Sequence, residues 1–218
     1  MPTSARRKPG RPPAAKADET RQRILLAARE VFSERGYDGA TFQAIALRAD
    51  LTRPAINHYF ASKRGLYREV AERTNELVVR FASEQAEGET TLIGRLAVFI
   101  TSITRADIAN PSGAAFLITT VLESQRHPEL SRTENEAIRI AREFLGRAVQ
   151  DAFERDELAL GTDVNSLIET LLVLLCGVGF YAGYVRSLEE TEAITDTLRQ
   201  LLAGALWRAR DLSEDVPV

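Results

Sequence analysis

Residues 41–60 read TFQAIALRADLTRPAINHYF, and this stretch decides the fold. Thr41 is a favoured N-cap residue, and apolar residues follow it at helical spacing, so a short helix is expected to begin there. A tight break follows at Asp50. Proline is tolerated in the first turn of a helix, so Pro54 indicates a second short helix from about Arg53 to Tyr59. Two short helices separated by a three-residue turn have the spacing of a helix-turn-helix.

The second short helix carries polar side chains on its outer face. Arg53, Asn57 and His58 fall on that face, whereas Ile56 and Phe60 turn inward onto the first helix. The major groove of B-DNA admits one α-helix, and Arg and Asn can each form two hydrogen bonds with a base edge. The pattern therefore predicts a DNA-reading helix. A solvated helix in a small bundle is the alternative when spacing alone is considered.

The same helical period extends outward in both directions. Upstream, an apolar stripe begins after Asp18 and ends at Gly36, with Arg29 placed off the stripe; downstream, Ser62 is expected to cap a helix that reaches about Gln85. Five further helices are expected at residues 90–108, 114–126, 132–154, 164–187 and 190–210. No stretch alternates between apolar and polar residues as a strand does. The expected fold class is therefore all-α, with about nine helices.

Charge is distributed unevenly along the 218 residues, whose net charge is −3. Residues 1–70 hold 14 Lys and Arg against 7 Asp and Glu, and residues 71–218 hold 14 against 24. A basic end on an acidic remainder suggests that one end meets a polyanion; a chance fluctuation or a solubility tail is the alternative. Residues 1–17 combine closely spaced prolines with five basic residues and no acidic residue, which predicts a disordered basic arm.

The sequence offers few groups for catalysis or metal binding. Cys176 is the single cysteine, which excludes an intrachain disulfide and a multi-cysteine zinc site. The two histidines, His58 and His127, lie far apart in the sequence, and the motifs of a nucleophile elbow, a phosphate-binding loop and a zinc protease are absent from it. We therefore expect no enzyme activity, no metal and no cofactor. No apolar run follows the N-terminal charges, so a cytoplasmic location is expected.

One apolar run needs a separate interpretation. Residues 171–185 are apolar except for three glycines, and Glu169 and Arg186 flank the run. A membrane span needs about 20 apolar residues, so a core helix or a subunit-interface helix is favoured and no membrane partner is expected. The small residues Gly177, Ala182 and Gly183 would let another helix approach closely, which fits an interface.

Further residues around the two short helices form a longer pattern. They are Ile24-Leu25-x-Ala27-Ala28-x-x-Val31-Phe32, Gly36-Tyr37-x-Gly39-x-Thr41, Ile45-Ala46, and Ala55-Ile56-x-x-Tyr59-Phe60-x-Ser62-Lys63-x-x-Leu66. This pattern, from Thr20 to Tyr67, closely resembles the DNA-binding domain of TetR-family transcriptional repressors. The resemblance covers about fifty of the 218 residues. It implies a helix-turn-helix domain at residues 18–62, a helical ligand-binding and dimerisation domain at residues 63–212, and a flexible tail at residues 213–218.

The resemblance also implies a role for individual positions. Thr41 would contact a phosphate, and Gln43 would reach a base. Arg53, Pro54 and Asn57 would face the groove, while His58 and Tyr59 would contact backbone or bases, and Thr52 at the start of this helix joins the candidate set. The Lys63 side chain and nearby backbone N–H groups would hold a phosphate. Replacing Lys63 would then weaken binding to all DNA sequences about equally.

Three positions depart from the family pattern. Asp50 stands where the turn usually has glycine, and Asp tolerates the left-handed conformation, so the turn is expected to form. Asn57 replaces a tyrosine of the recognition helix, which implies a different operator. Gly65 replaces an acidic residue, which removes a capping box from the helix that follows Ser62.

The basic arm has two possible modes of contact with DNA. Lys8-Pro9-Gly10-Arg11-Pro12 is similar to the core of an AT-hook, which places arginine in a narrow minor groove. Sequence-neutral attraction of phosphates is the simpler account and is favoured here. The arm residues expected to contact DNA are Arg6, Arg7, Lys8 and Arg11.

The resemblance implies a homodimeric repressor that binds an operator in double-stranded DNA and leaves it when a small-molecule effector binds. Aromatic side chains are candidates for lining the effector pocket, with a mixture of core and interface positions as the alternative. They are Phe116, Phe144, Phe180, Tyr181, Tyr184 and Trp207. Two other functions stay open, namely a helical enzyme or small-molecule carrier with a relic N-terminal domain, and a transcriptional activator of the same fold.

Overall fold

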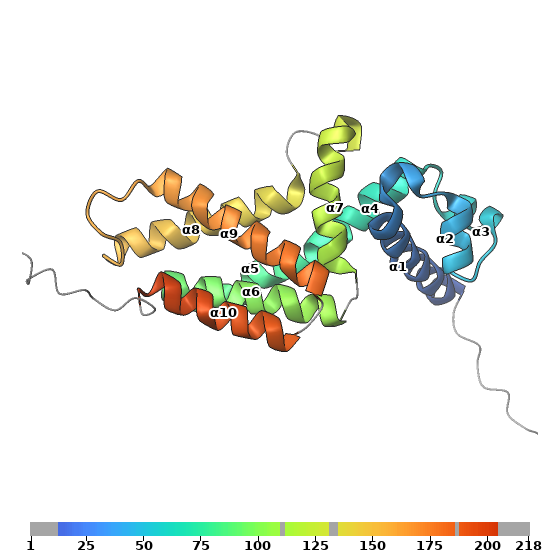
Figure 1. The fold of residues 1–218 in the computed structure, drawn as a ribbon. Helices are drawn as coiled ribbons and strands as arrows, with labels where there is room; N and C mark the ends of the chain where they lie inside the picture. The colour runs from blue at the N-terminus through green and yellow to red at the C-terminus, as the bar shows by residue number, and fades with distance from the viewer. Residues whose placement is uncertain (1–12, 110–111, 131–134, 186–187, 205–218) are drawn as a thin grey trace, which may run out of the picture. The chain divides into compact units, whose positions relative to one another are not determined.

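The computed structural model describes residues 13–109, 112–130, 135–185 and 188–204, and every regular element in them is a helix (Figure 1). The chain divides into two compact units, residues 1–70 and 71–218. Three helical elements follow one another with no residue between them: α4 (Lys63–Asn75), the π-helical η1 (Glu76–Arg80) and α5 (Phe81–Ala86). When these three are counted as one helix, the described residues contain 9 helices besides the short η2. The all-α prediction is confirmed.

The first unit is built on α1 (Pro13–Gly39), on which α2 (Phe42–Arg48) packs, and α3 (Arg53–Tyr59) packs on α2. The apolar stripe predicted along α1 is buried, and so are Ile45 of α2 and Ile56 of α3. Gly36 interrupts the helical conformation of α1 with a φ of 68°, so the regular helix ends where the sequence predicts.

Two details of α1 differ from the sequence prediction. The helix begins at Pro13, so residues 13–17 are helical and not part of a disordered arm. The physical reason is that proline suits the first turn of a helix, and the alanines and the lysine that follow it are strong helix formers. Arg29, expected off the apolar stripe, is buried. It directly follows the buried Ala28, and a long arginine stem can cover apolar surface.

The division between the two units falls within α4, between Val70 and Ala71, which is eight residues beyond the boundary expected after Ser62. The start of α4 packs into the core of the first unit. The ring of Tyr67 meets the ring of Phe32 edge to face with centroids 5.0 Å apart, and both side chains are buried. The first turns of α4 therefore complete the core that supports the short helices.

The second unit contains five more α-helices and one short 3-10 helix. They are α6 (Leu92–Ala109), α7 (Gly113–Arg126), η2 (Pro128–Leu130), α8 (Glu136–Glu154), α9 (Val164–Val185) and α10 (Leu188–Leu202). The stacked rings of Phe99 and Phe144, with centroids 4.6 Å apart, lie in its core. Helix α10 lies along α6, and α9 packs against α7 and α8 (Figure 1). Helix α10 ends at Leu202, eight residues before the expected end at Arg210, because the chain turns at Gly204, whose φ of 70° is left-handed. The expected tail at 213–218 lies outside the described residues.

Candidate nucleic-acid interface

Threonine side chains set the start of both short helices. The Oγ1 of Thr41 accepts a hydrogen bond of 3.1 Å from the backbone N–H of Ala44, and the Oγ1 of Thr52 accepts one of 3.3 Å from Ala55. Both threonines have extended backbone conformations, as N-cap residues do. Pro54 lies in the first turn of α3. The predicted starts of α2 and α3 are therefore confirmed.

The turn between α2 and α3 uses the left-handed conformation at Asp50, whose φ is 51°. The backbone N–H of Leu51 donates to the carbonyl of Ala46 over 2.9 Å, and Arg23 of α1 donates to the carbonyl of Asp50 over 3.3 Å. The prediction that aspartate would allow this turn is confirmed.

Replacing Asp50 by alanine should lower the free energy of unfolding by about 1 kcal/mol, because alanine adopts the left-handed conformation at a higher cost than aspartate. Replacing Asp50 by glycine should change it by only a few tenths of a kcal/mol, since glycine adopts the conformation without strain but gains freedom in the unfolded chain. Urea unfolding of the two variants measures this difference. Equal stabilities would show that the turn is not strained at this position.

The outer face of α3 is available to a ligand. The side chains of Arg53, Asn57 and His58 are exposed, and Tyr59 is half-buried with its ring edge-to-face against the ring of His58, centroids 5.3 Å apart. Within the part of the chain that the structure describes, Arg53 and Asn57 form no hydrogen bond or ion pair with other side chains. The sequence-predicted candidates Thr41, Gln43, Thr52 and Pro54 are exposed as well.

Other basic side chains of this unit are engaged inside it. Arg48 of α2 donates to the carboxylates of Glu34 and Glu30 of α1, with Nη–Oε distances of 2.8 Å to each, and these bonds hold the pKa of Arg48 above its ordinary value. Arg21 of α1 forms a bidentate pair with Glu69 of α4. Arg21 and Arg48 therefore tie helices together and do not belong to the set of cations that are free to meet phosphate.

Lys63, whose side chain and nearby backbone N–H groups were predicted to hold a phosphate, is also engaged inside the unit. Its Nζ donates to the backbone carbonyls of Tyr37 (2.7 Å), Ala40 (3.2 Å) and Asp38 (3.3 Å), and it lies 4.4 Å from the centroid of the Tyr37 ring. An ammonium group has three donors, and three carbonyls accept them here. This side chain therefore has no donor left for a phosphate, although Lys63 was predicted to hold one.

The start of α4 keeps other features that were predicted for it. The Oγ of Ser62 accepts a hydrogen bond of 3.1 Å from the N–H of Gly65, as expected of its cap. Arg64, in the same turn, is exposed and has no hydrogen-bond or ion-pair partner among the described residues. The arm residues Arg6, Arg7, Lys8 and Arg11 lie outside the described residues.

The aromatic residues proposed for an effector pocket do not form one cluster. Phe116 and Phe144 are buried, whereas Phe180 and Tyr181 of α9 are 60% and 39% exposed. A side chain as exposed as Phe180 does not line an enclosed pocket of its own chain, so this part of the prediction is corrected. The side chain of Tyr184 and all of Trp207 lie outside the described residues. Cys176 of α9 is half-buried, and burial raises the pKa of its thiol, as expected of an unreactive cysteine.

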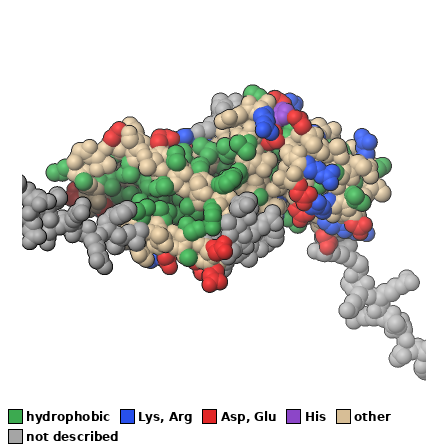
Figure 2. Space-filling model, in the orientation of Figure 1, with side chains coloured by type: hydrophobic (Ala, Val, Ile, Leu, Met, Phe, Trp, Pro, Cys, Tyr) green, Lys and Arg blue, Asp and Glu red, His purple; other side chains and the backbone are tan. Residues whose placement is uncertain are grey.

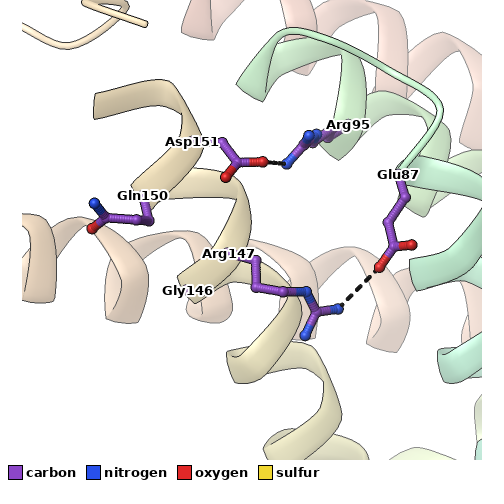
Figure 3. Close-up of a pocket in the computed structure, with 6 residues that line it drawn as sticks. All are labelled: Glu87, Arg95, Gly146, Arg147, Gln150 and Asp151. Atoms are coloured by element: carbon purple, nitrogen blue, oxygen red, sulfur yellow. Dashed lines mark hydrogen bonds and ion pairs between the residues drawn. The ribbon is translucent and has the colours of Figure 1, made fainter. Parts of the chain in front are cut away.

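A depression of about 590 Å³, lined mostly by residues with charged side chains, lies on the second unit beside α8 (Figure 3). Its charged side chains pair with one another: Arg95 with Asp151 over 2.6 Å, and Arg147 with Glu87 over 3.4 Å. Gln150 and Gly146 complete the lining. No residue of the predicted aromatic set takes part. No sequence pattern predicts this depression, because its residues come from separate parts of the chain and form no motif. The described residues contain no group of His, Cys, Asp and Glu suited to a metal ion.

The helix-turn-helix geometry and the comparison with known proteins agree. The family model for bacterial regulatory proteins of the tetR family matches residues 24–70, which span most of α1 and all of α2 and α3. Residues 24–70 therefore carry a DNA-binding domain of the TetR type, and the chain is a transcriptional regulator with this domain. The predicted family and function class are confirmed.

Similar proteins extend the likeness over nearly the whole chain. The transcriptional regulator UidR of Escherichia coli (strain K12) is 26% identical over 191 residues, which are 87% of this chain and 94% of UidR. The solved structure of FadR from Bacillus subtilis with stearoyl-CoA has a TM-score of 0.67 at 20% identity, over 84% of this chain and 98% of that one. CifR bound to a 26-base-pair operator has a TM-score of 0.64 at 22% identity, over 90% and 98% of the two chains. These relatives are regulators, and the chain is not an enzyme.

Proposed function

We propose that this protein is a homodimeric repressor that binds an operator through α3 of each subunit and leaves it when a small molecule binds. The observation that carries the proposal is the exposed polar face of α3. Arg53 and Asn57 are side chains that read guanine and adenine edges in the major groove, and both have their polar groups free within the described residues. A small-molecule carrier needs no such face.

Helix α9 supports the dimer. Its apolar window at residues 164–181 is long enough to cross a membrane, and only 17% of that window is buried within the chain. Leu171, Leu172 and Leu175 pack into the core, while Val173 and Phe180 are 70% and 60% exposed. Figure 2 shows hydrophobic side chains gathered on this part of the second unit. A helix with one side in a protein core and another apolar side exposed to solvent is typical of a subunit interface. We therefore propose that a second copy of this chain packs against the exposed side of α9.

Release by a small molecule rests on the two-unit architecture and on the family. The solved FadR structure contains stearoyl-CoA, which supports the proposal that this chain also binds a small-molecule effector. An effector lowers DNA affinity only if it binds more tightly to the subunit arrangement that fits DNA poorly. The DNA-reading face is compatible with repression and with activation, because the effect of binding on transcription depends on where the operator lies relative to the promoter. A cytoplasmic location is part of this proposal.

Selection of bound duplexes from a random pool by the purified full chain tests the proposal. We expect enrichment of one inverted repeat whose half-sites lie ~34–36 Å apart, or a multiple of that distance, as two-fold symmetric helix-turn-helix proteins require. Compounds that release the selected duplex then identify the effector class, and in vitro transcription separates repression from activation. A monomer that ignores every duplex at low ionic strength would overturn the proposal.

A further inference from the structure

The short segment between α1 and α2 is held in place from α4. Gly36 breaks the helical conformation of α1, and residues 37–40 then lead the chain to Thr41. Three carbonyls of this segment point to one atom, the Nζ of Lys63, at distances of 2.7 to 3.3 Å. Carbonyls at the end of a helix have no intrahelical partner, and a cation there satisfies them.

The contact with Ala40 lies one peptide away from the start of α2. The carbonyl of Ala40, 3.2 Å from the Nζ of Lys63, belongs to the same peptide plane as the N–H of Thr41. Ala40 itself is buried, so this plane is fixed on both sides. Thr41 then caps α2 through the N–H of Ala44. The orientation of the exposed residues Thr41 and Gln43 therefore depends on the position of Lys63.

We propose that Lys63 is a positioning residue for DNA binding: it sets the start of α2, so that Thr41 and Gln43 meet the duplex, and it does not contact a phosphate itself. This inference rests on the proposed DNA-binding role of Thr41. The neighbouring Arg64 provides the contrast, because it is exposed and has no partner within the described residues. A phosphate contact by a side chain in the first turn of α4 belongs to Arg64 in this arrangement.

The salt dependence of operator binding separates the two roles. Lys63→Met should weaken binding of the full chain to its selected operator by roughly tenfold, the size of one well-placed contact, and leave the slope of log K against log salt unchanged. Arg64→Met is the matched control, because it removes one phosphate contact from each subunit of the proposed dimer and should reduce that slope by about 1.8. Fluorescence anisotropy at several salt concentrations measures both. A slope reduced by Lys63→Met to the extent expected of Arg64→Met overturns the proposal.

Two further variants keep the proposal testable if Lys63→Met folds poorly. Lys63→Arg keeps the charge, but a planar guanidinium cannot direct donors from one atom to three carbonyls, so it should bind as weakly as Lys63→Met. Full affinity of Lys63→Arg would mean that charge alone matters. In a double-mutant cycle, Thr41→Ala and Lys63→Arg should weaken binding by less than the product of their separate effects, and independent effects contradict the positioning role. If the unaltered protein binds no duplex, the proposed function fails and this inference fails with it. If the unaltered protein binds its operator and Lys63→Met reduces the salt slope, this inference alone fails.

Discussion

Replacing Phe180 by glutamate is expected to separate the subunits and to reduce operator binding by at least about 100-fold, which corresponds to ~2.7 kcal/mol. Phe180 is 60% exposed on the apolar side of α9, next to Tyr181. In a two-fold symmetric interface the change places two carboxylates in apolar surroundings, and each unpaired charge costs several kcal/mol to bury. A single subunit then contacts only one half-site, so affinity falls with the loss of the second.

Leu122→Glu is the matched control for this experiment. Leu122 of α7 is 58% exposed, which is close to the exposure of Phe180, but it does not lie on the apolar side of α9. This variant should remain a dimer and bind the operator as the unaltered chain does. Sedimentation velocity reports the mass of each variant, and a gel shift reports its binding. If the Phe180→Glu protein stays dimeric, α9 does not form the subunit interface.

Replacing Arg53 by alanine should weaken binding to the selected operator by ~1–3 kcal/mol, or about 5- to 150-fold, and relax the base preference at one position of each half-site. Arg53 is exposed at the first turn of α3, and no group of the described chain holds its guanidinium. Arginine pairs with two acceptors of guanine, so its loss removes discrimination as well as affinity.

A scrambled duplex of the same length is the control for Arg53→Ala. Binding to it depends on phosphate contacts and should fall far less than binding to the operator. Binding titrations with both duplexes at one salt concentration give the two affinities. Equal losses on the operator and on the scrambled duplex would place Arg53 at the DNA backbone and not at a base.

The short helices could be predicted residue by residue because their signals are local. Thr41, Thr52 and Ser62 act within three residues of their own positions, and Pro54 restricts its own φ. The partners of Lys63 could not be predicted in this way. They lie 23 to 26 residues upstream, and no periodic pattern links an ammonium to carbonyls at such a separation.

The second unit shows the same contrast between local features, which the sequence predicts, and long-range packing, which it does not. Helical periodicity located the starts of its helices to within a few residues, but it missed the end of α10 at Leu202 and did not reveal the π-helical segment Glu76–Arg80 between α4 and α5. Phe144 and Phe180 look alike in a hydropathy pattern, yet the first is 2% exposed in the core and the second is 60% exposed. A pattern shows which side chains are apolar, whereas the packing of distant helices decides which of them a chain covers by itself.

In the proposed dimer, pairing through the uncovered side of α9 links occupancy of the operator to the abundance of the protein. When subunits are scarcer than their dissociation constant, mass action makes the number of pairs follow the square of the number of chains. Halving synthesis then leaves about a quarter of the pairs, so a modest change in expression produces a larger change in regulation.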